Sequence, residues 1–316
     1  MKVSIIGGGG RVGSDAAYAL QLGGIVTHIA LVDVNQDMAA GEALDLRHGA
    51  SFTANQTFTS GGYEECEGSD CVVITAGLRR KPDESRLDLI NRNVGLFTGI
   101  LESLKEVKLA DVATILVVSN PVDILTHLTV KSGLLPQSQI MGLGTVLDTA
   151  RFRSLIADHF KVGAKDVNAV ILGEHGDSMV PIWSGATING VAISSIPGWS
   201  DSSADELFET TKKSGATVIR QKGGAGRAVG IAIKEVVEGI ALDDGRLLPV
   251  SSAQTGTMGI SDISLSLPTV VGRAGVVAVW EPKVSDAERE ALMKSAAALK
   301  ETFAIVEEST FGSARA

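Results

Sequence analysis

The first 120 residues alternate short apolar runs with longer stretches in which apolar residues recur at a helical spacing. A strand–helix–strand rhythm joins parallel strands, so this part of the chain predicts an α/β fold with a doubly wound parallel sheet. The apolar runs are the expected strands, at 3–6, 28–34, 55–60, 71–77 and 113–119. The helices expected between them lie at 11–22, 38–49 and 87–107.

From about residue 141 the rhythm changes. A chain of 316 residues also exceeds the size at which a single core usually stops growing. We therefore expect two domains, a parallel-sheet domain over 1–144 and an α+β domain over 145–316. The second domain is expected to contain helices at 147–160, 203–219, 228–240 and 285–306. It is also expected to contain a strand that runs into a glycine-flanked loop over 167–177, strands with turns over 180–197, and a hairpin at 268–280.

Composition narrows the class of function. Hydrophobic residues make up 44% of the chain, charged residues 21%, and the net charge is -9. A negative protein does not suit nucleic acid or an anionic membrane surface, and no apolar stretch reaches the ~18 residues of a membrane span. The start, MKVSIIGGGG, does not read as a signal peptide, so we expect a cytoplasmic protein. Cys66 and Cys71 favour two reduced thiols over a disulfide or half a metal site, and no metal is expected.

The glycine-rich turn after the first expected strand is typical of a dinucleotide site. Its spacing fits G-x-G-x-x-G at Gly8, Gly10 and Gly13, or a second register that starts at Gly7. Glycines let the backbone approach a pyrophosphate at a helix N-terminus. Asp33 ends the second strand, where an acid accepts hydrogen bonds from a ribose diol. The alternative is a plain chain turn with Asp33 as a strand-end cap.

The residues after Asp33 indicate which nicotinamide cofactor binds. Positions 34–38 carry no lysine or arginine to offset the repulsion between Asp33 and a 2′-phosphate. We therefore expect NAD rather than NADP, bound on an N-terminal Rossmann sheet, with the C-terminal α+β domain binding the substrate.

One histidine stands apart from the other four. His28, His48 and His159 fall in expected strands or helices, whereas His175 lies in the polar loop GEHGD after an apolar strand. An imidazole with a pKa near ~6.5 suits proton exchange with an alcohol at neutral pH.

An acid and a base on one expected helix give His175 its chemical context. Asp148 and Arg151 are three residues apart and share a face. Asp148 is placed to fix the tautomer of His175, and Arg151 to hold a carboxylate through two hydrogen bonds. The alternative is an intrahelical ion pair on a solvated surface.

Two further segments follow strands of the expected sheet. The loop GLRRKPDESR at 77–86 gathers cations on an acidic protein, as a local anion site or as a solubilising surface loop. Asn120, in SNPVD, follows the fifth strand, at the sheet edge where ligands bind in such folds.

Six motifs in order and at family spacing make the chain resemble the lactate/malate dehydrogenases, and among them the malate dehydrogenases that are similar to lactate dehydrogenases. They are the glycine turn, VITAG at 73–77, RKPDESR at 80–86, SNPVDIL at 119–125, LDTARFR at 147–153 and GEHGD at 173–177. The likeness covers nearly the whole chain.

The resemblance implies a role for each matching residue. His175 is the implied catalytic acid and base, Asp148 its partner, and Arg86 the loop arginine that polarises the substrate carbonyl. Arg151 is implied to bind the C1 carboxylate, and Asn120 to lie near the substrate oxygen and the nicotinamide. The implied cofactor contacts are Gly8, Gly10, Arg11, Val12, Gly13, Asp33, Asn93, Val118 and Asn120.

Arg80 leads us to expect malate as the substrate. In the family an arginine before Lys-Pro is typical of malate enzymes, and a buried guanidinium left unpaired by pyruvate would cost on the order of 3–5 kcal/mol. If the loop register slips by one, Arg79 takes this role. The expectation is an NAD-dependent malate dehydrogenase of the tricarboxylic acid cycle that acts on malate and oxaloacetate.

Two alternatives to that expectation remain open. One is an L-lactate or other 2-hydroxy acid dehydrogenase, and the other is a non-catalytic NADH-binding protein. The resemblance also implies a homo-oligomer, a tetramer rather than a dimer.

Overall fold

The computed structural model describes residues 1–78 and 86–311, and an eight-stranded sheet forms its centre. The strand order is β12-β11-β6-β5-β4-β1-β2-β3. Strands β1 to β6 are parallel, whereas β11 and β12 join the β6 edge antiparallel. The strands are β1 (Lys2–Ile6), β2 (His28–Val32), β3 (Thr57–Gly61), β4 (Cys71–Ile74), β5 (Thr114–Val117), β6 (Ile140–Gly142), β11 (Ser251–Thr255) and β12 (Ser261–Ser266).

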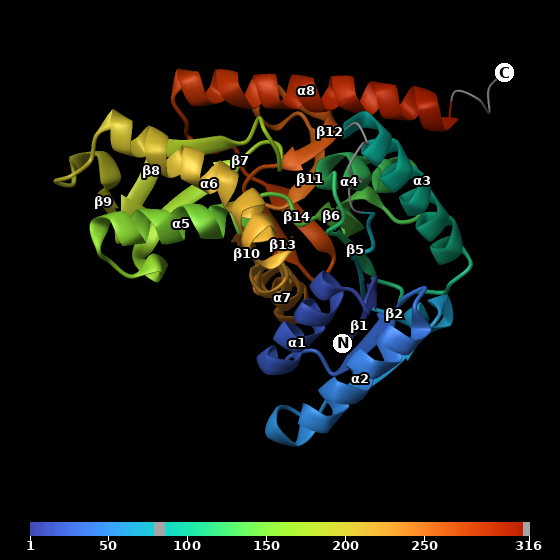
Figure 1. The fold of residues 1–316 in the computed structure, drawn as a ribbon. Helices are drawn as coiled ribbons and strands as arrows, with labels where there is room; N and C mark the ends of the chain where they lie inside the picture. Colours follow the sequence, from blue (N-terminus) through green and yellow to red (C-terminus); the bar gives the residue numbers. More distant parts are fainter. Residues whose placement is uncertain (79–85, 312–316) are drawn as a thin grey trace.

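Helices cover both faces of this sheet (Figure 1). Apolar side chains of α1 (Arg11–Gly23), α2 (Gln36–Gly49) and α7 (Arg227–Leu242) pack in one core. Those of α3 (Arg86–Lys105), α4 (Val122–Lys131) and α8 (Asp286–Phe311) pack in the other. Burying both faces explains the continuous apolar runs of β4 and β5, each of which is fully buried. The predicted doubly wound sheet is therefore confirmed.

The second half of the chain builds a smaller α/β unit beside the large sheet. Helices α5 (Val146–Phe160) and α6 (Asp201–Lys222) pack against the antiparallel sheet β7-β8-β9 around a third core. Helix α8 runs along the edge of the molecule over both units (Figure 1). The remaining strands are β7 (Val167–Leu172), β8 (Val180–Ile188), β9 (Val191–Ala192), β10 (Arg246–Leu248), β13 (Thr269–Gly272) and β14 (Gly275–Val279).

Five of the described helices and strands were not predicted from the sequence: α4, β6, β10, β11 and β12. Two of them belong to the large sheet although they lie beyond residue 250, so the second half of the chain completes the sheet begun by the first. The division at 144 stays a prediction.

The two cysteines are buried and free, and burial raises the pKa of Cys66 to about 11 and that of Cys71 to about 12. Among the described residues, every helix is too short or too polar to cross a membrane.

Candidate active site

The glycine turn makes a tight cradle between β1 and α1. Gly7 has a φ of 87° and its amide donates to the Val32 carbonyl at 2.8 Å. A Cβ at Gly8 would lie 2.8 Å from the Leu31 Cβ, and one at Gly13 would collide with the Gly7 carbonyl oxygen. Because only glycines fit here, the backbone is bare where helix α1 begins at Arg11. This surface fits a dinucleotide pyrophosphate.

Asp33 faces that turn from the end of β2. Its carboxylate accepts hydrogen bonds from the Gly9 and Asn35 amides, both at 3.0 Å. Asp33 therefore caps the end of the strand. Its carboxylate is also partly buried beside the glycine turn, at the position where a ribose acceptor is expected. A shallow depression lies next to Asp33 in the sequence. It is lined by Val34, Asn35, Gln36 and Asp37, none of which carries a positive charge.

Other predicted cofactor contacts lie around the same edge of the sheet. Val118 is partly buried, and Asn120 is exposed just after β5. Asn93 is buried, and its side-chain oxygen accepts the Leu78 amide at 2.8 Å, so it fixes the chain that leaves β4. The guanidinium of Arg11 donates to the Lys222 and Gly224 carbonyls at 3.0 Å, which ties α1 to the end of α6.

Val12 lies in the first turn of α1 and is partly buried against the core of that face. These positions, like the other predicted contacts, remain proposals for cofactor binding.

The centre of the site is the carboxylate of Asp148, in the first turn of α5. Its Oδ2 lies 2.5 Å from Nδ1 of His175, and its Oδ1 accepts a hydrogen bond of 2.8 Å from Arg151. The Asp148 side chain is 1% exposed, whereas those of His175 and Arg151 are 25% and 19% exposed. Both predicted roles of Asp148 therefore coexist. Asp148 forms an intrahelical ion pair with Arg151 that is buried at the Asp148 end, and the same carboxylate orients the imidazole of His175.

Charge inside the site favours the protonated histidine. Burial lowers the pKa of His175, but the charge and hydrogen bond of Asp148 outweigh burial and raise it above its ordinary value. Burial likewise raises the pKa of Asp148, and His175 and Arg151 more than reverse this effect, so that the carboxyl group stays ionised. An imidazolium paired with a carboxylate is suited to give a proton to a nearby oxygen.

The His175 loop is held from both halves of the chain. Gly173 exchanges two backbone hydrogen bonds with Ser266 of β12, and the Glu174 amide donates to the Ser295 hydroxyl of α8 at 2.9 Å. The His175 amide donates to Oδ2 of Asp123 in α4 at 2.7 Å. Sequence reasoning missed Asp123 although it lies in the SNPVD motif.

The basic loop of the prediction lies outside the described residues. Arg79 and Arg80 belong to 79–85, and Arg86 is the first residue of α3.

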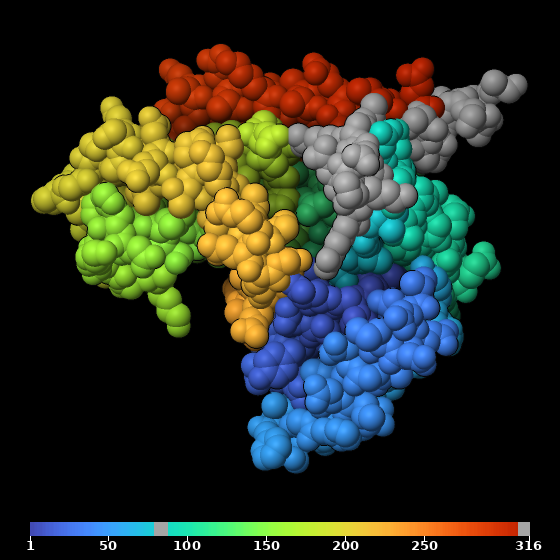
Figure 2. Space-filling view, viewed as in Figure 1, coloured from blue at the N-terminus to red at the C-terminus, as the bar shows by residue number. Residues whose placement is uncertain are grey.

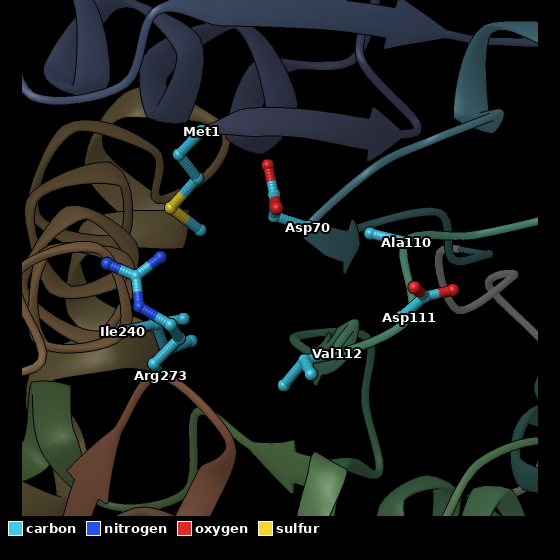
Figure 3. A pocket seen from close by; sticks show the side chains of 7 residues that line it. All are labelled: Met1, Asp70, Ala110, Asp111, Val112, Ile240 and Arg273. Atoms are coloured by element: carbon cyan, nitrogen blue, oxygen red, sulfur yellow. The ribbon is translucent and has the colours of Figure 1, made fainter.

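Figure 2 shows a hollow next to the orange residues of α6, with green residues from the middle of the chain at its floor. A separate pocket lies at the opposite edge of the sheet, lined by Met1, Asp70, Ala110, Asp111, Val112, Ile240 and Arg273 (Figure 3). No predicted site residue lines it.

A bare glycine cradle, a carboxylate at the end of β2 and an Asp–His–Arg cluster around the buried Asp148 together fit an NAD-dependent 2-hydroxy acid dehydrogenase. Residues 1–142 match the family model described as lactate/malate dehydrogenase, NAD binding domain, and residues 145–310 match its alpha/beta C-terminal domain. The chain belongs to the lactate/malate dehydrogenase family, and NAD is its cofactor.

Three similar proteins of nearly the same length are named L-lactate dehydrogenase. L-lactate dehydrogenase 1 of Clostridium acetobutylicum is 42% identical over 306 residues, which covers 95% of this chain and 97% of that protein. L-lactate dehydrogenase of a Thermoanaerobacter species is 41% identical over 304 residues, with 95% and 97% covered. The ligand-bound crystal structure of the minor L-lactate dehydrogenase of Enterococcus mundtii matches with a TM-score of 0.93 at 35% identity and covers 96% of this chain and 98% of that one.

The prediction of malate as substrate is wrong in the light of these relatives, and so are the dicarboxylate partner and the place in the tricarboxylic acid cycle. The prediction depended on one cation, Arg80, which lies outside the described residues. A guanidinium selects a second carboxylate only if it is closed in with the substrate, which sequence position alone does not establish.

Proposed function

We propose that this protein catalyses the reversible NAD-dependent reduction of pyruvate to L-lactate. The observation that carries the reaction type is the Asp148 carboxylate, shared between the His175 imidazole and the Arg151 guanidinium. The choice of lactate follows the names of the full-length relatives. Among the described residues, Arg151 offers a cation for a carboxylate and His175 a proton donor for a carbonyl oxygen, which suits a 2-keto acid.

Arg151 is the proposed anchor for the C1 carboxylate of pyruvate. It uses Nη1 to hold Asp148, which leaves its other donors to point away from that ion pair. A planar guanidinium matches two carboxylate oxygens through parallel hydrogen bonds. Its orientation is fixed by the buried Asp148, so the bound acid has a defined position relative to His175.

His175 is the proposed proton donor. Its Nδ1 is held by Asp148, so Nε2 is the nitrogen left to face the substrate. NADH, when bound, supplies the hydride that reduces C2 of pyruvate. The N–H bond at Nε2 breaks as the O–H bond of lactate forms, the electron pair stays on the ring nitrogen, and Asp148 holds the neutral tautomer with the proton on Nδ1. Acid–base assistance of this kind gives roughly 10²–10⁴ in rate.

The remaining roles come from the family resemblance. We propose that Arg86 stabilises charge on the C2 oxygen and that Asn120 lies between substrate and nicotinamide. The exposed place of Asn120 after β5 supports this role.

The test is a steady-state assay of NADH consumption with pyruvate, oxaloacetate and a branched 2-keto acid. We expect kcat/KM to be highest for pyruvate, because the relatives act on lactate by name. A higher kcat/KM for oxaloacetate or for the branched acid would contradict pyruvate as the substrate, and no turnover of any acid would contradict the enzyme assignment.

His175→Asn tests the chemical role within the same assay. The variant is expected to bind NADH as the wild type does and to lose turnover by a factor of at least about 10². His159→Asn, an exposed histidine on α5, is the control and should keep full activity. Near-normal turnover of His175→Asn would contradict the role of His175.

A further inference from the structure

A second buried carboxylate, in addition to that of Asp148, accepts a hydrogen bond from the His175 loop. Asp123 is in the first turn of α4, which follows β5 of the cofactor-binding sheet. Its side chain is 2% exposed, and its Oδ2 accepts the main-chain amide of His175 at 2.7 Å. This hydrogen bond joins the helix after Asn120 to the loop that carries the proton donor.

The pairing of Asp123 is incomplete for a buried charge. Among the described residues, its Oδ1 accepts no hydrogen bond of ordinary geometry, although the Ser251 hydroxyl is close enough to lower the pKa of the carboxyl group. Burial is the larger effect and raises the pKa of Asp123 to about 6. Near neutral pH the Asp123 carboxyl group is therefore mostly ionised, although its burial disfavours the charged form.

A neutral residue would serve as well if the loop needed only an anchor. An asparagine oxygen accepts a main-chain amide without the penalty of a buried charge. What a carboxylate adds is negative charge near the imidazole, and the charge of Asp123 raises the pKa of His175 in addition to that of Asp148. The other charged groups that act on this pair are Glu174 and Arg151.

We propose that Asp123 is a positioning residue that holds the main chain of His175 and, through its charge, helps to keep the imidazole protonated for reduction of the keto acid. This inference rests on the proposed function. Asp148 acts on the ring directly, whereas Asp123 acts from the other half of the chain and couples the His175 loop to the segment that carries Asn120.

Two variants separate charge from hydrogen bond. Asp123→Asn keeps an acceptor for the His175 amide and removes the charge, and Asp123→Ala removes both. Asp70→Asn is the matched control, because the Asp70 carboxylate accepts the Lys2 main-chain amide at 2.6 Å at the far edge of the sheet. The readouts are the pH profiles of kcat/KM for pyruvate reduction and lactate oxidation, and the NMR titration of the His175 ring.

In Asp123→Asn we expect the ring pKa to fall by about half a unit to one unit. Both pH profiles should then move to lower pH together, with reduction at low pH within about twofold of wild type. Asp123→Ala should show the same shift and a further loss of kcat of about tenfold, since the loop loses its anchor. Asp70→Asn should match the wild type.

An unchanged ring pKa in Asp123→Asn would overturn the inference, as would a loss of activity without any shift of the two profiles, which marks a purely structural role. If the wild type turns over no keto acid, the proposed function fails. The ring titration then still decides whether the charge of Asp123 acts on His175.

Discussion

At the scale of single residues, the Asp148 carboxylate determines the protonation of His175. Reduction needs the imidazolium, which is present below the raised pKa of His175 and is lost as pH rises through it. In Asp148→Asn the ring keeps the burial that lowers its pKa and loses the strongest effect that raises it. We expect kcat/KM for pyruvate to fall at least about 10²-fold near pH 7.5 and its pH profile to move to lower pH.

The matched control is Asp158→Asn, an exposed acid on the same helix, which should leave the profile unchanged. A variant of Asp148 that titrates like the wild type would show that this carboxylate does not determine the protonation of His175.

The central site residues were open to prediction because their chemistry is local. Asp148 and Arg151 share a helix face, and His175 stands in a glycine-flanked loop. Asp123 could not be predicted in this way, because its importance comes from its burial and from its hydrogen bond to His175, which lies 52 positions away. The substrate could not be predicted either, because the presence of Arg80 in the sequence does not establish that its charge meets a second carboxylate.

At the scale of elements, the N-terminus of α8 is joined to β8 by one side chain. Glu288 accepts hydrogen bonds from the Trp183 and Ser184 amides at 2.7 and 2.9 Å and from the Ser285 amide at 2.8 Å. Burial raises the pKa of Glu288, but hydrogen bonds from the hydroxyl and amide of Ser184 and from the amide and hydroxyl of Ser285 outweigh burial and lower it. The bonds therefore stabilise the fold above the ordinary glutamate pKa and are lost as pH falls through the lowered value.

Glu288→Ala is expected to lower the free energy of unfolding by about 1–3 kcal/mol at pH 7, with a smaller difference at acid pH, measured by urea denaturation. Glu290→Ala, which removes an exposed ion pair to Lys294, should change it by less than about 1 kcal/mol. Equal effects of the two substitutions at pH 7 would contradict a joining role for Glu288.

The missed elements share a physical reason. Helix α4 is buried on nearly all sides, so its sequence VDILTHLTVK shows no polar face to mark a helical period. Strands β11 and β12 bury polar residues, among them Ser251, Ser252 and Ser264, which hides the alternation of a half-buried strand. The apolar runs of β1 and β2 and the helical spacing of apolar residues in α1 and α2 could be recognised in the sequence, because propensity and burial agree there.

At the scale of the whole molecule, the predicted homo-oligomer stays a prediction. Helices α1 and α7 pack together on one side of the large sheet and present apolar side chains to solvent, with Tyr18 55%, Leu22 60% and Ile231 62% exposed. Large exposed apolar groups on neighbouring helices are typical of surfaces that meet another chain. We expect light scattering to give the mass of a tetramer.

Ile231→Glu should reduce that mass, whereas Val277→Glu, an equally exposed apolar residue on β14, should not. A monomeric wild type at micromolar concentration would contradict the prediction.

The central claim is that Arg151 holds the acid while His175 exchanges the proton. It is tested most directly by a crystal structure of the protein with NADH and oxamate, an unreactive amide that mimics pyruvate. We expect the oxamate carboxylate to pair with Arg151 through two hydrogen bonds and its C2 oxygen to accept from Nε2 of His175 at about 2.6–3.2 Å. Oxamate bound with its carboxylate away from Arg151, or with its C2 oxygen out of reach of His175, would contradict the claim.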